Sequence, residues 1–213
     1  MDHPVKPRFI VFEGPDGSGK TSALERARAW LQKERVPVVT MREPGGTEIG
    51  EEIRRVLLNT PRGPDRMTPR TELLLFLASR AQLIAERIRP ALKQRHVILC
   101  DRFNTSTFVY QGLAGVIPGS RVLEIMECVG TYTPDLTLTF TTDFETMMIR
   151  SSPLLDRMER KGEAYYRKVI DGYEEVLTNT PEILGPHERV DASMSPGAID
   201  MRVQELIERE LTG

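Results

Sequence analysis

A glycine-rich segment near the start of the chain constrains the fold more than any other feature. Residues 14–21 read Gly-Pro-Asp-Gly-Ser-Gly-Lys-Thr, which matches the pattern G-x-x-x-x-G-K-[S/T]. An apolar run at residues 9–12 precedes it and is typical of a strand buried on both faces. Residues 21–34 follow it and are predicted to be helical. A strand, a glycine-rich turn and a helix in this order predict a phosphate-binding loop, because backbone N–H groups and the positive end of the helix point at the same place.

The residues of this loop are expected to hold the phosphates of a nucleoside triphosphate. Lys20 supplies a mobile positive charge for the β and γ phosphates. The hydroxyl of Thr21 is expected to bind Mg²⁺, which offsets charge as the γ-phosphoryl group leaves. The alternative, a glycine-rich turn with an incidental lysine, fits the flanking strand and helix less well. The candidate phosphate-binding residues are Gly14, Pro15, Asp16, Gly17, Ser18, Gly19, Lys20 and Thr21.

The rest of the chain alternates between predicted strands and helices. Further strands are expected at 36–41, 96–100, 135–140 and 188–191, and helices near 47–57, 68–89, 142–150, 161–177 and 195–211. Strands that alternate with helices of this length predict an α/β fold with a parallel sheet and helices on both faces. Ligands then bind at the carboxyl ends of the strands. No repeat or linker interrupts the sequence, so residues 1–213 are predicted to form a single domain.

Composition narrows the possible partners and locations. The 213 residues carry a formal charge of −2 without a basic stripe, so polymeric nucleic acid is not an expected partner. No apolar run approaches the roughly 20 residues that span a bilayer, and residues 1–4 lack the features of a signal peptide. We therefore expect no membrane association and a cytoplasmic location. Cys100 and Cys128 have no paired spacing and are predicted to be reduced, buried thiols.

The sequence Asp101-Arg102-Phe103 follows the third predicted strand and distinguishes between classes of phosphate-loop protein. ATP-hydrolysing motors usually need a glutamate after the aspartate, whereas the planar fork of an arginine suits an acceptor phosphate. A GTPase is disfavoured because Asn-Lys-x-Asp is absent from the sequence. Asp101 has two interpretations of equal weight: an ion-pair partner of Arg102, or a residue that supports Mg²⁺ binding.

Several short motifs together resemble the thymidylate kinase family, in particular its bacterial members. They read Phe-Glu-Gly-Pro-Asp-Gly-Ser-Gly-Lys-Thr at 12–21, Arg-Glu-Pro-Gly-Gly-Thr at 42–47, Phe-Leu-Ala-Ser-Arg at 76–80, Asp-Arg-Phe at 101–103 with Ser106 and Tyr-Gln-Gly at 110–112, and Pro-Asp-Leu-Thr at 134–137. The resemblance runs nearly end to end. It implies a P-loop kinase fold with a five-stranded parallel sheet, a homodimer, and transfer of the γ-phosphoryl group from ATP to dTMP.

The resemblance also implies roles for individual residues. Arg42 and Arg102 would hold the acceptor phosphate, and Asp16 would lie near the sugar or phosphate of dTMP. Ser106, Tyr110 and Gln111 would face the nucleotide. Two arginines at the ends of neighbouring strands can clamp a phosphate in line with the γ-phosphoryl group, and such positioning supplies most of phosphoryl-transfer catalysis. A plain turn is the alternative interpretation of residues 42–46.

Phe76 and Arg80 lie four residues apart on a predicted helix and therefore share one face. Leu73, Leu77, Ile84 and Ile88 form a separate stripe that is predicted to enter the core. In the family this Phe–Arg pair meets thymine, with the ring stacked on the base and the guanidinium donating to a base carbonyl. The alternative is that Phe76 belongs to the core and that Arg80 is a solvated charge.

Residues 150–161 are predicted to form a lid that differs from that of similar bacterial proteins. Where an arginine- and glycine-rich segment is expected, the sequence reads Ser-Ser-Pro-Leu-Leu at 151–155. The remaining candidates for a cation that reaches the transferring group are Arg157 first, Arg150 second and Arg160 third, with 151–153 as the hinge. The alternative is that Arg157 and Arg160 are surface charges paired with neighbouring acids.

Two rival functions remain open at this stage. One is a kinase for another nucleoside monophosphate, such as dUMP or dCMP; a deoxynucleoside fits poorly because it has no phosphate for Arg42 and Arg102 to bind. The other is a nucleotide-binding module that has lost catalysis, which the altered lid would allow.

Overall fold

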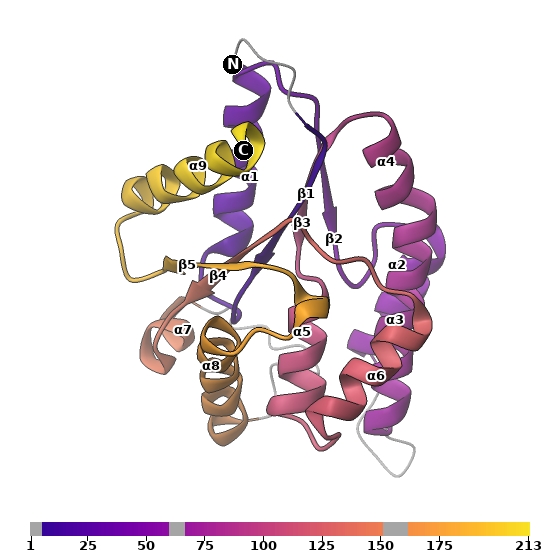
Figure 1. The fold of residues 1–213 in the computed structure, drawn as a ribbon. Helices are drawn as coiled ribbons and strands as arrows, with labels where there is room; N and C mark the ends of the chain where they lie inside the picture. Colours follow the sequence, from indigo (N-terminus) through magenta and orange to yellow (C-terminus); the bar gives the residue numbers. More distant parts are fainter. Residues whose placement is uncertain (1–5, 60–66, 151–161) are drawn as a thin grey trace.

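A five-stranded, wholly parallel sheet forms the centre of the computed structural model, which describes residues 6–59, 67–150 and 162–213 (Figure 1). The strand order is β2-β3-β1-β4-β5. The strands are β1 (Arg8–Glu13), β2 (Val38–Arg42), β3 (Val97–Asp101), β4 (Leu136–Thr141) and β5 (His187–Asp191). The fold class and the strand number expected from the sequence are confirmed.

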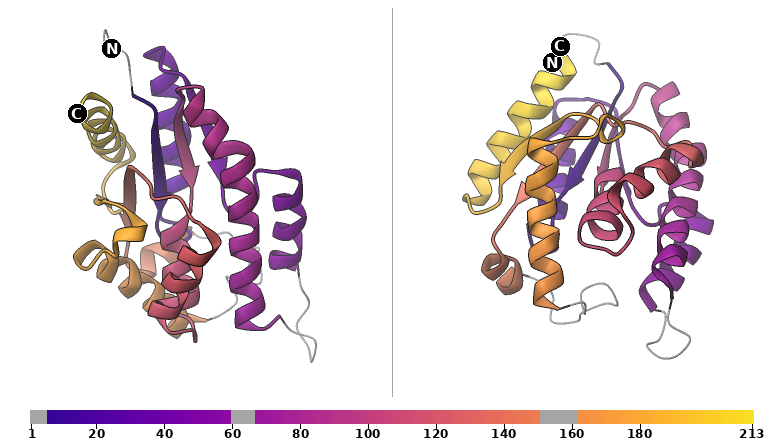
Figure 2. Two further views of the ribbon diagram at one scale, coloured as in Figure 1. Left: turned by 45° about the vertical axis from the view of Figure 1, so that its right-hand side comes forward. Right: turned by 60° about the horizontal axis from the view of Figure 1, so that its bottom comes forward.

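Helices cover both faces of this sheet (Figure 2). Two π-helical stretches interrupt them: Ile84–Ile88 continues α3 into α4, and Phe108–Leu113 continues α5. The predicted helix at 68–89 is therefore one helical run that extends to Lys93. The described α-helices are α1 (Lys20–Lys33), α2 (Glu48–Asn59), α3 (Pro69–Leu83), α4 (Arg89–Lys93), α5 (Asn104–Thr107), α6 (Gly119–Val129), α7 (Phe144–Arg150), α8 (Glu163–Thr178) and α9 (Pro196–Thr212).

Alternate side chains of β1 enter two different cores, because successive residues of a strand point to opposite faces. Ile10 and Phe12 belong to the cluster formed with α1 and α9. Phe9 and Val11 belong to the cluster formed with the helical run from Leu83 to Ala91. Burial on both faces explains the continuous apolar run of β1 and fixes the position of the loop that follows it.

Local signals set the helix starts largely as the sequence predicts. Thr68 caps α3 by accepting a hydrogen bond from the Thr71 amide at 3.2 Å, and Pro69 occupies the first turn. Ser195 caps α9 in the same way. At α7 the capping side chain is Asp143, which accepts from the Thr146 amide at 2.7 Å. An ionised carboxylate is a good acceptor at a helix start.

The expectation that both thiols are buried is wrong for Cys128. Cys100 is buried but Cys128 is exposed, because Cys128 lies on the outer face of α6. On α2, Leu57 is fully buried whereas Ile49 is 54% exposed and Val56 is 51% exposed. Among the described helices, none is long and apolar enough to cross a membrane.

Candidate active site

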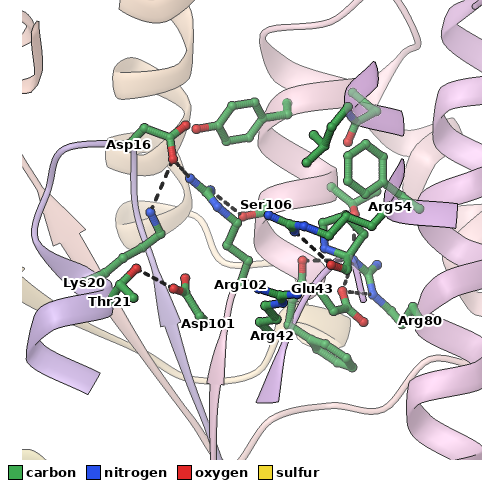
Figure 3. A pocket seen from close by; sticks show the side chains of 17 residues that line it. Asp16, Lys20, Thr21, Arg42, Glu43, Arg54, Arg80, Asp101, Arg102 and Ser106 are labelled. Carbon is green, nitrogen blue, oxygen red and sulfur yellow. Dashed lines mark hydrogen bonds and ion pairs between the residues drawn. The ribbon is translucent and has the colours of Figure 1, made fainter. Parts of the chain in front are cut away.

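A cavity of about 240 Å³ opens at the carboxyl ends of β1, β2 and β3 (Figure 3). Its position agrees with the rule for ligands of parallel sheets. Helices α2, α3 and α5 complete its walls. It is lined by Asp16, Lys20, Thr21, Arg42, Glu43, Pro44, Arg54, Leu58, Phe76, Arg80, Asp101, Arg102, Phe103, Ser106, Thr107, Tyr110 and Gln111.

The glycine-rich loop after β1 is packed tightly against β4. A Cβ at Gly14, whose φ is 144°, would lie 2.6 Å from the carbonyl oxygen of Phe140, so only glycine fits. The hydroxyl of Ser18 is buried and has no hydrogen-bond partner within the described ranges. Because buried polar atoms are normally satisfied, this hydroxyl fits a phosphate oxygen.

Lys20 lies inside this loop and is only 5% exposed. Its Nζ donates to the Pro15 carbonyl at 3.3 Å and lies 3.6 Å from Asp16. Burial, and after it the charge of Arg102, lowers the pKa of Lys20, while the carboxylate of Asp16 opposes this shift. The ammonium group is thus held at the cavity wall without a strong protein hydrogen bond, which leaves it available to phosphate oxygens.

Thr21 and Asp101 meet at the cavity wall. Thr21 Oγ1 donates to Asp101 Oδ2 at 2.5 Å, and Asp101 Oδ1 is buried without a partner in the part of the chain that the structure describes. The interpretation of Asp101 as the ion-pair partner of Arg102 is wrong, because Arg102 pairs with Asp16 instead. A hydroxyl beside a carboxylate with an unused oxygen fits a Mg²⁺ ion that also takes phosphate oxygens and waters. The described residues contain no cluster of three or more metal-binding side chains, and such a cluster is not required for Mg²⁺ bound with phosphates.

Arg102 projects into the middle of the cavity from the turn after β3. Its Nη2 lies 2.6 Å from Asp16 Oδ1, and its guanidinium carbon lies 5.3 Å from the ring centre of Tyr110. Burial acts to raise the pKa of Asp16, but Arg102 and Lys20 overcome it and lower that pKa to about 2. The φ of Arg102 is 69°, a left-handed value that is rare outside glycine.

Two further arginines lie on the β2 and α2 side of the cavity. The Nη2 of Arg42 donates to both oxygens of Glu51, at 3.0 and 2.9 Å, and the Arg42 side chain is 55% exposed. Arg54 donates to the carbonyl of Pro44 at 2.9 Å. Arg42 was expected from the sequence; Arg54 was missed, although its position on the helix after the 42–47 motif could have indicated it.

Phe76 and Arg80 both line the cavity, so the structure brings the predicted pair together at one site. Arg80 is not a solvated charge: it is 2% exposed and lies 2.7 Å from Glu43. Its Nη2 also donates to the Phe103 carbonyl at 3.0 Å and to Thr107 Oγ1 at 2.7 Å. Its Nη1 is buried without a partner among the described residues, so one donor remains for a ligand.

The other predicted nucleotide contacts are placed on α5 and the π-helical stretch that follows it. Ser106 Oγ donates to Glu13 at 2.6 Å and accepts from Arg102 Nη1 at 3.0 Å. Gln111 Nε2 donates to Glu72 at 2.9 Å. The hydroxyl of Tyr110 is buried and finds no partner in the described segments. All three side chains line the cavity.

The predicted lid is described only at its first residue. Arg150 ends α7, and its Nη1 donates to the Ala192 carbonyl at 2.8 Å, so Arg150 does not line the cavity. Arg157, Arg160 and the hinge at 151–153 lie outside the described residues.

Three buried side chains were missed by the sequence analysis. Glu13 is fully buried at the end of β1, and Glu43 is buried beside Arg80. Tyr173 of α8 reaches Glu13 across the core. A charged residue directly after a buried strand is a usable signal for Glu13, whereas the sequence contains no signal for Tyr173.

Comparison with known proteins identifies the family of this chain. A family model described as thymidylate kinase matches residues 12–187. The thymidylate kinase of Finegoldia magna is 38% identical over 204 residues, which covers 94% of this chain and 98% of the relative. That of Symbiobacterium thermophilum is 39% identical over 206 residues, covering 95% and 94%. The crystal structure of thymidylate kinase from Ehrlichia chaffeensis superposes with a TM-score of 0.75 at 28% identity, covering 95% of this chain and 99% of that one. The chain therefore belongs to the thymidylate kinase family.

Proposed function

We propose that the cavity binds ATP and dTMP end to end and that its residues transfer the γ-phosphoryl group of ATP to the phosphate of dTMP, which yields dTDP and ADP in dTTP synthesis. One observation carries this proposal: a single cavity is lined both by Lys20 and Thr21 of the phosphate loop and by Phe76 and Arg80 of α3. Figure 3 shows Lys20 and Thr21 on one side of the cavity and Arg80 on the other, with Arg102 between them. Such a cavity suits a phosphorylated acceptor facing a phosphorylated donor.

At the donor end, the loop from Gly14 to Thr21 would hold the β and γ phosphates. The free hydroxyl of Ser18 and the ammonium group of Lys20 are the side-chain donors there. Thr21 and Asp101 would hold Mg²⁺, which neutralises developing charge on the phosphates when bound.

At the acceptor end, Arg102 and Arg42 would bind the phosphate of dTMP, with Arg54 as a third guanidinium beside them. Asp16 fixes Arg102 through the 2.6 Å ion pair and can also reach the sugar. The 2.9–3.0 Å contacts between Arg42 and Glu51 lie at an exposed site, where ion pairs are weak. A dianionic phosphate can therefore compete for Arg42.

The base end would select thymine by stacking and by one hydrogen bond. Phe76 offers its ring to the base, and the unpaired Nη1 of Arg80 can donate to a base carbonyl. Cytosine carries an amino group where thymine has the carbonyl at position 4, so a donor would face a donor and dCMP would be rejected. Because uracil keeps the carbonyl, discrimination against dUMP depends on contacts to the methyl group.

The oligomeric state is also part of the proposal. Helices α2 and α3 lie side by side at the edge of the molecule (Figure 2), and both helices carry exposed apolar side chains. These side chains are Ile49, Val56 and Leu74, each more than half exposed. Exposed apolar patches mark association sites, and we propose that this one forms the interface of a homodimer, with the protein acting in the cytoplasm.

A panel of acceptors tests the proposed reaction. Turnover with ATP is measured by coupled assay for dTMP, dUMP, dCMP and thymidine, with purified protein and Mg²⁺. We expect dTMP to give the highest kcat/KM, dUMP to be weaker, and dCMP and thymidine to give almost none. An absence of turnover with every monophosphate would indicate a nucleotide-binding module instead.

A further inference from the structure

Tyr173 lies on α8 with its ring in the core and its hydroxyl at the back of the acceptor site. The side chain is 1% exposed and packs in the cluster with Val109, Tyr110 and Val169. The apolar ring alone accounts for this packing, and a phenylalanine would serve equally. The hydroxyl has a separate role, because burying a hydroxyl without a hydrogen bond destabilises the folded state.

The hydroxyl of Tyr173 joins a closed polar cluster around Glu13. It donates to Glu13 Oε2 at 3.1 Å, lies 3.1 Å from Ser106 Oγ and accepts from Arg102 Nη1 at 3.4 Å. Ser106 Oγ likewise donates to Glu13 Oε2, at 2.6 Å, and accepts from Arg102 Nη1, at 3.0 Å. Two hydroxyls thus stand side by side between one guanidinium nitrogen and one carboxylate oxygen.

Both hydroxyls donate to the same carboxylate oxygen, Glu13 Oε2. Each then presents a lone pair to Arg102 Nη1, and every polar atom of the cluster is satisfied. The other oxygen of Glu13 accepts from the amides of Phe103 and Ser106, at 2.7 and 3.0 Å. Glu13 therefore fixes the backbone on the carboxyl side of Arg102 as well.

We propose that Tyr173 is a positioning residue that holds the guanidinium of Arg102 in the orientation needed to bind the acceptor phosphate. Asp16 fixes Nη2 from the cavity side, and the two hydroxyls fix Nη1 from the core side. Holding the guanidinium from two sides matters because the acceptor phosphate must lie in line with the γ-phosphoryl group. A small displacement of the phosphate from that line lowers the rate of transfer. This inference rests on the proposed role of Arg102.

The test replaces the hydroxyl and leaves the ring, as Tyr173→Phe. The matched control is Tyr165→Phe, which removes a hydroxyl of the same helix that donates to the Tyr110 carbonyl at 2.8 Å. Dissociation constants for dTMP and for thymidine are measured by titration calorimetry for wild type and both variants. Thymidine carries the same base and sugar but no phosphate, so its binding reports the base and sugar contacts and none of the phosphate contacts, which include the one with Arg102.

Tyr173→Phe is expected to weaken dTMP binding by about tenfold, as loss of a hydrogen bond to a charged group does, and to change thymidine binding by less than twofold. KM for ATP should stay constant while kcat with saturating dTMP falls. Tyr165→Phe should affect the two ligands equally. For a destabilised variant, the ligand-induced rise in Tm gives the same comparison. Equal weakening of dTMP and thymidine by Tyr173→Phe, or no change in either, would overturn the inference.

Wild-type turnover with dTMP is measured in the same series. Its absence would refute the proposed function, whereas normal wild-type turnover with no phosphate-selective loss in Tyr173→Phe would refute only the role of Tyr173.

Discussion

Glu43 and Arg80 form an ion pair inside the protein, with Oε2 and Nη2 2.7 Å apart and each side chain only 3% exposed. The pair holds Arg80 at the cavity wall, while the other terminal nitrogen, Nη1, is buried without a partner in the described part of the chain. The second oxygen of Glu43 is buried without a partner among the described residues. Burial raises the pKa of Glu43 to about 7, against the attraction of Arg80, and Glu13 adds to the rise.

This raised pKa predicts a pH dependence of stability. Between pH 4.5 and about 7 the folded protein retains a proton on Glu43 that the unfolded chain has released. Stability contributed by Glu43 is therefore present below pH 4.5 and is lost as pH rises through 7, by up to about 3 kcal/mol. Urea unfolding at pH 5, 6, 7 and 8 should show this loss in wild type relative to Glu43→Gln. If the free energy of unfolding changes with pH in the same way in wild type and in Glu43→Gln, the predicted contribution of Glu43 is wrong.

Lys20→Ala should abolish transfer and leave the fold intact, because Lys20 lies at the ligand end of the sheet. A fall of roughly 10³-fold in kcat is expected from loss of a cation at the transferring group. Steady-state kinetics and circular dichroism measure the two effects. Lys33→Ala, at the exposed end of the same helix, is the control and should retain full activity. Near-normal turnover in folded Lys20→Ala would disprove the assignment of the phosphate loop.

Phe76→Ala should raise KM for dTMP roughly tenfold or more, since base stacking on an aromatic ring contributes about 1–3 kcal/mol. KM for ATP should change little, because Phe76 is proposed to contact the base of dTMP and not ATP. Phe144→Ala is a control with the same truncation: its ring packs against Arg167 outside the cavity. Equal changes in both KM values would favour a purely structural role for Phe76.

Asp101→Asn should raise the Mg²⁺ concentration required for half-maximal activity roughly 10–100-fold. The reason is that the carboxylate both accepts from Thr21 and offers an unused oxygen at the proposed metal position. A Mg²⁺ titration of initial rates measures the shift. Asp171→Asn, on the exposed side of α8, should leave the titration unchanged; an unshifted curve for Asp101→Asn would remove Asp101 from the metal site.

Arg157→Ala should lower kcat by roughly 10³-fold with little change in KM for dTMP, if Arg157 supplies the cation of the lid. Arg150→Ala should have a smaller effect, because Arg150 donates to the Ala192 carbonyl rather than into the cavity. Steady-state kinetics of both variants and of Arg160→Ala decide between them. If kcat of all three variants stays within a few-fold of the wild-type value, this segment contributes no charge to the reaction.

Features that depend on neighbours in the sequence were predictable. The loop at 14–21, the caps Thr68 and Ser195, and the alternating pattern of β1 follow from residues a few positions apart. They fixed the fold class, and they placed the phosphate end and the Phe76–Arg80 face correctly at the cavity.

Features that depend on long-range pairing were not predictable. Arg80 donates a hydrogen bond to Glu43, which lies 37 positions away in the sequence. Glu13 accepts hydrogen bonds from Ser106, 93 positions away, and from Tyr173, 160 positions away. The pairing of Asp101 with Thr21 instead of Arg102 depends on where α1 begins relative to the end of β3. No local sequence pattern predicts these side-chain contacts, because they form only when the sheet has assembled.

The left-handed backbone of Arg102 sets backbone strain against the contacts of the side chain at a single position. Glycine would adopt a φ of 69° with less strain than arginine does, so a choice made on backbone geometry alone would favour Arg102→Gly, although that substitution removes the ion pair with Asp16. The enzyme would then lose the guanidinium that lies between donor and acceptor. Stabilising substitutions proposed for this protein from backbone geometry should therefore exclude Arg102, since here the unfavourable conformation is part of what makes the site work.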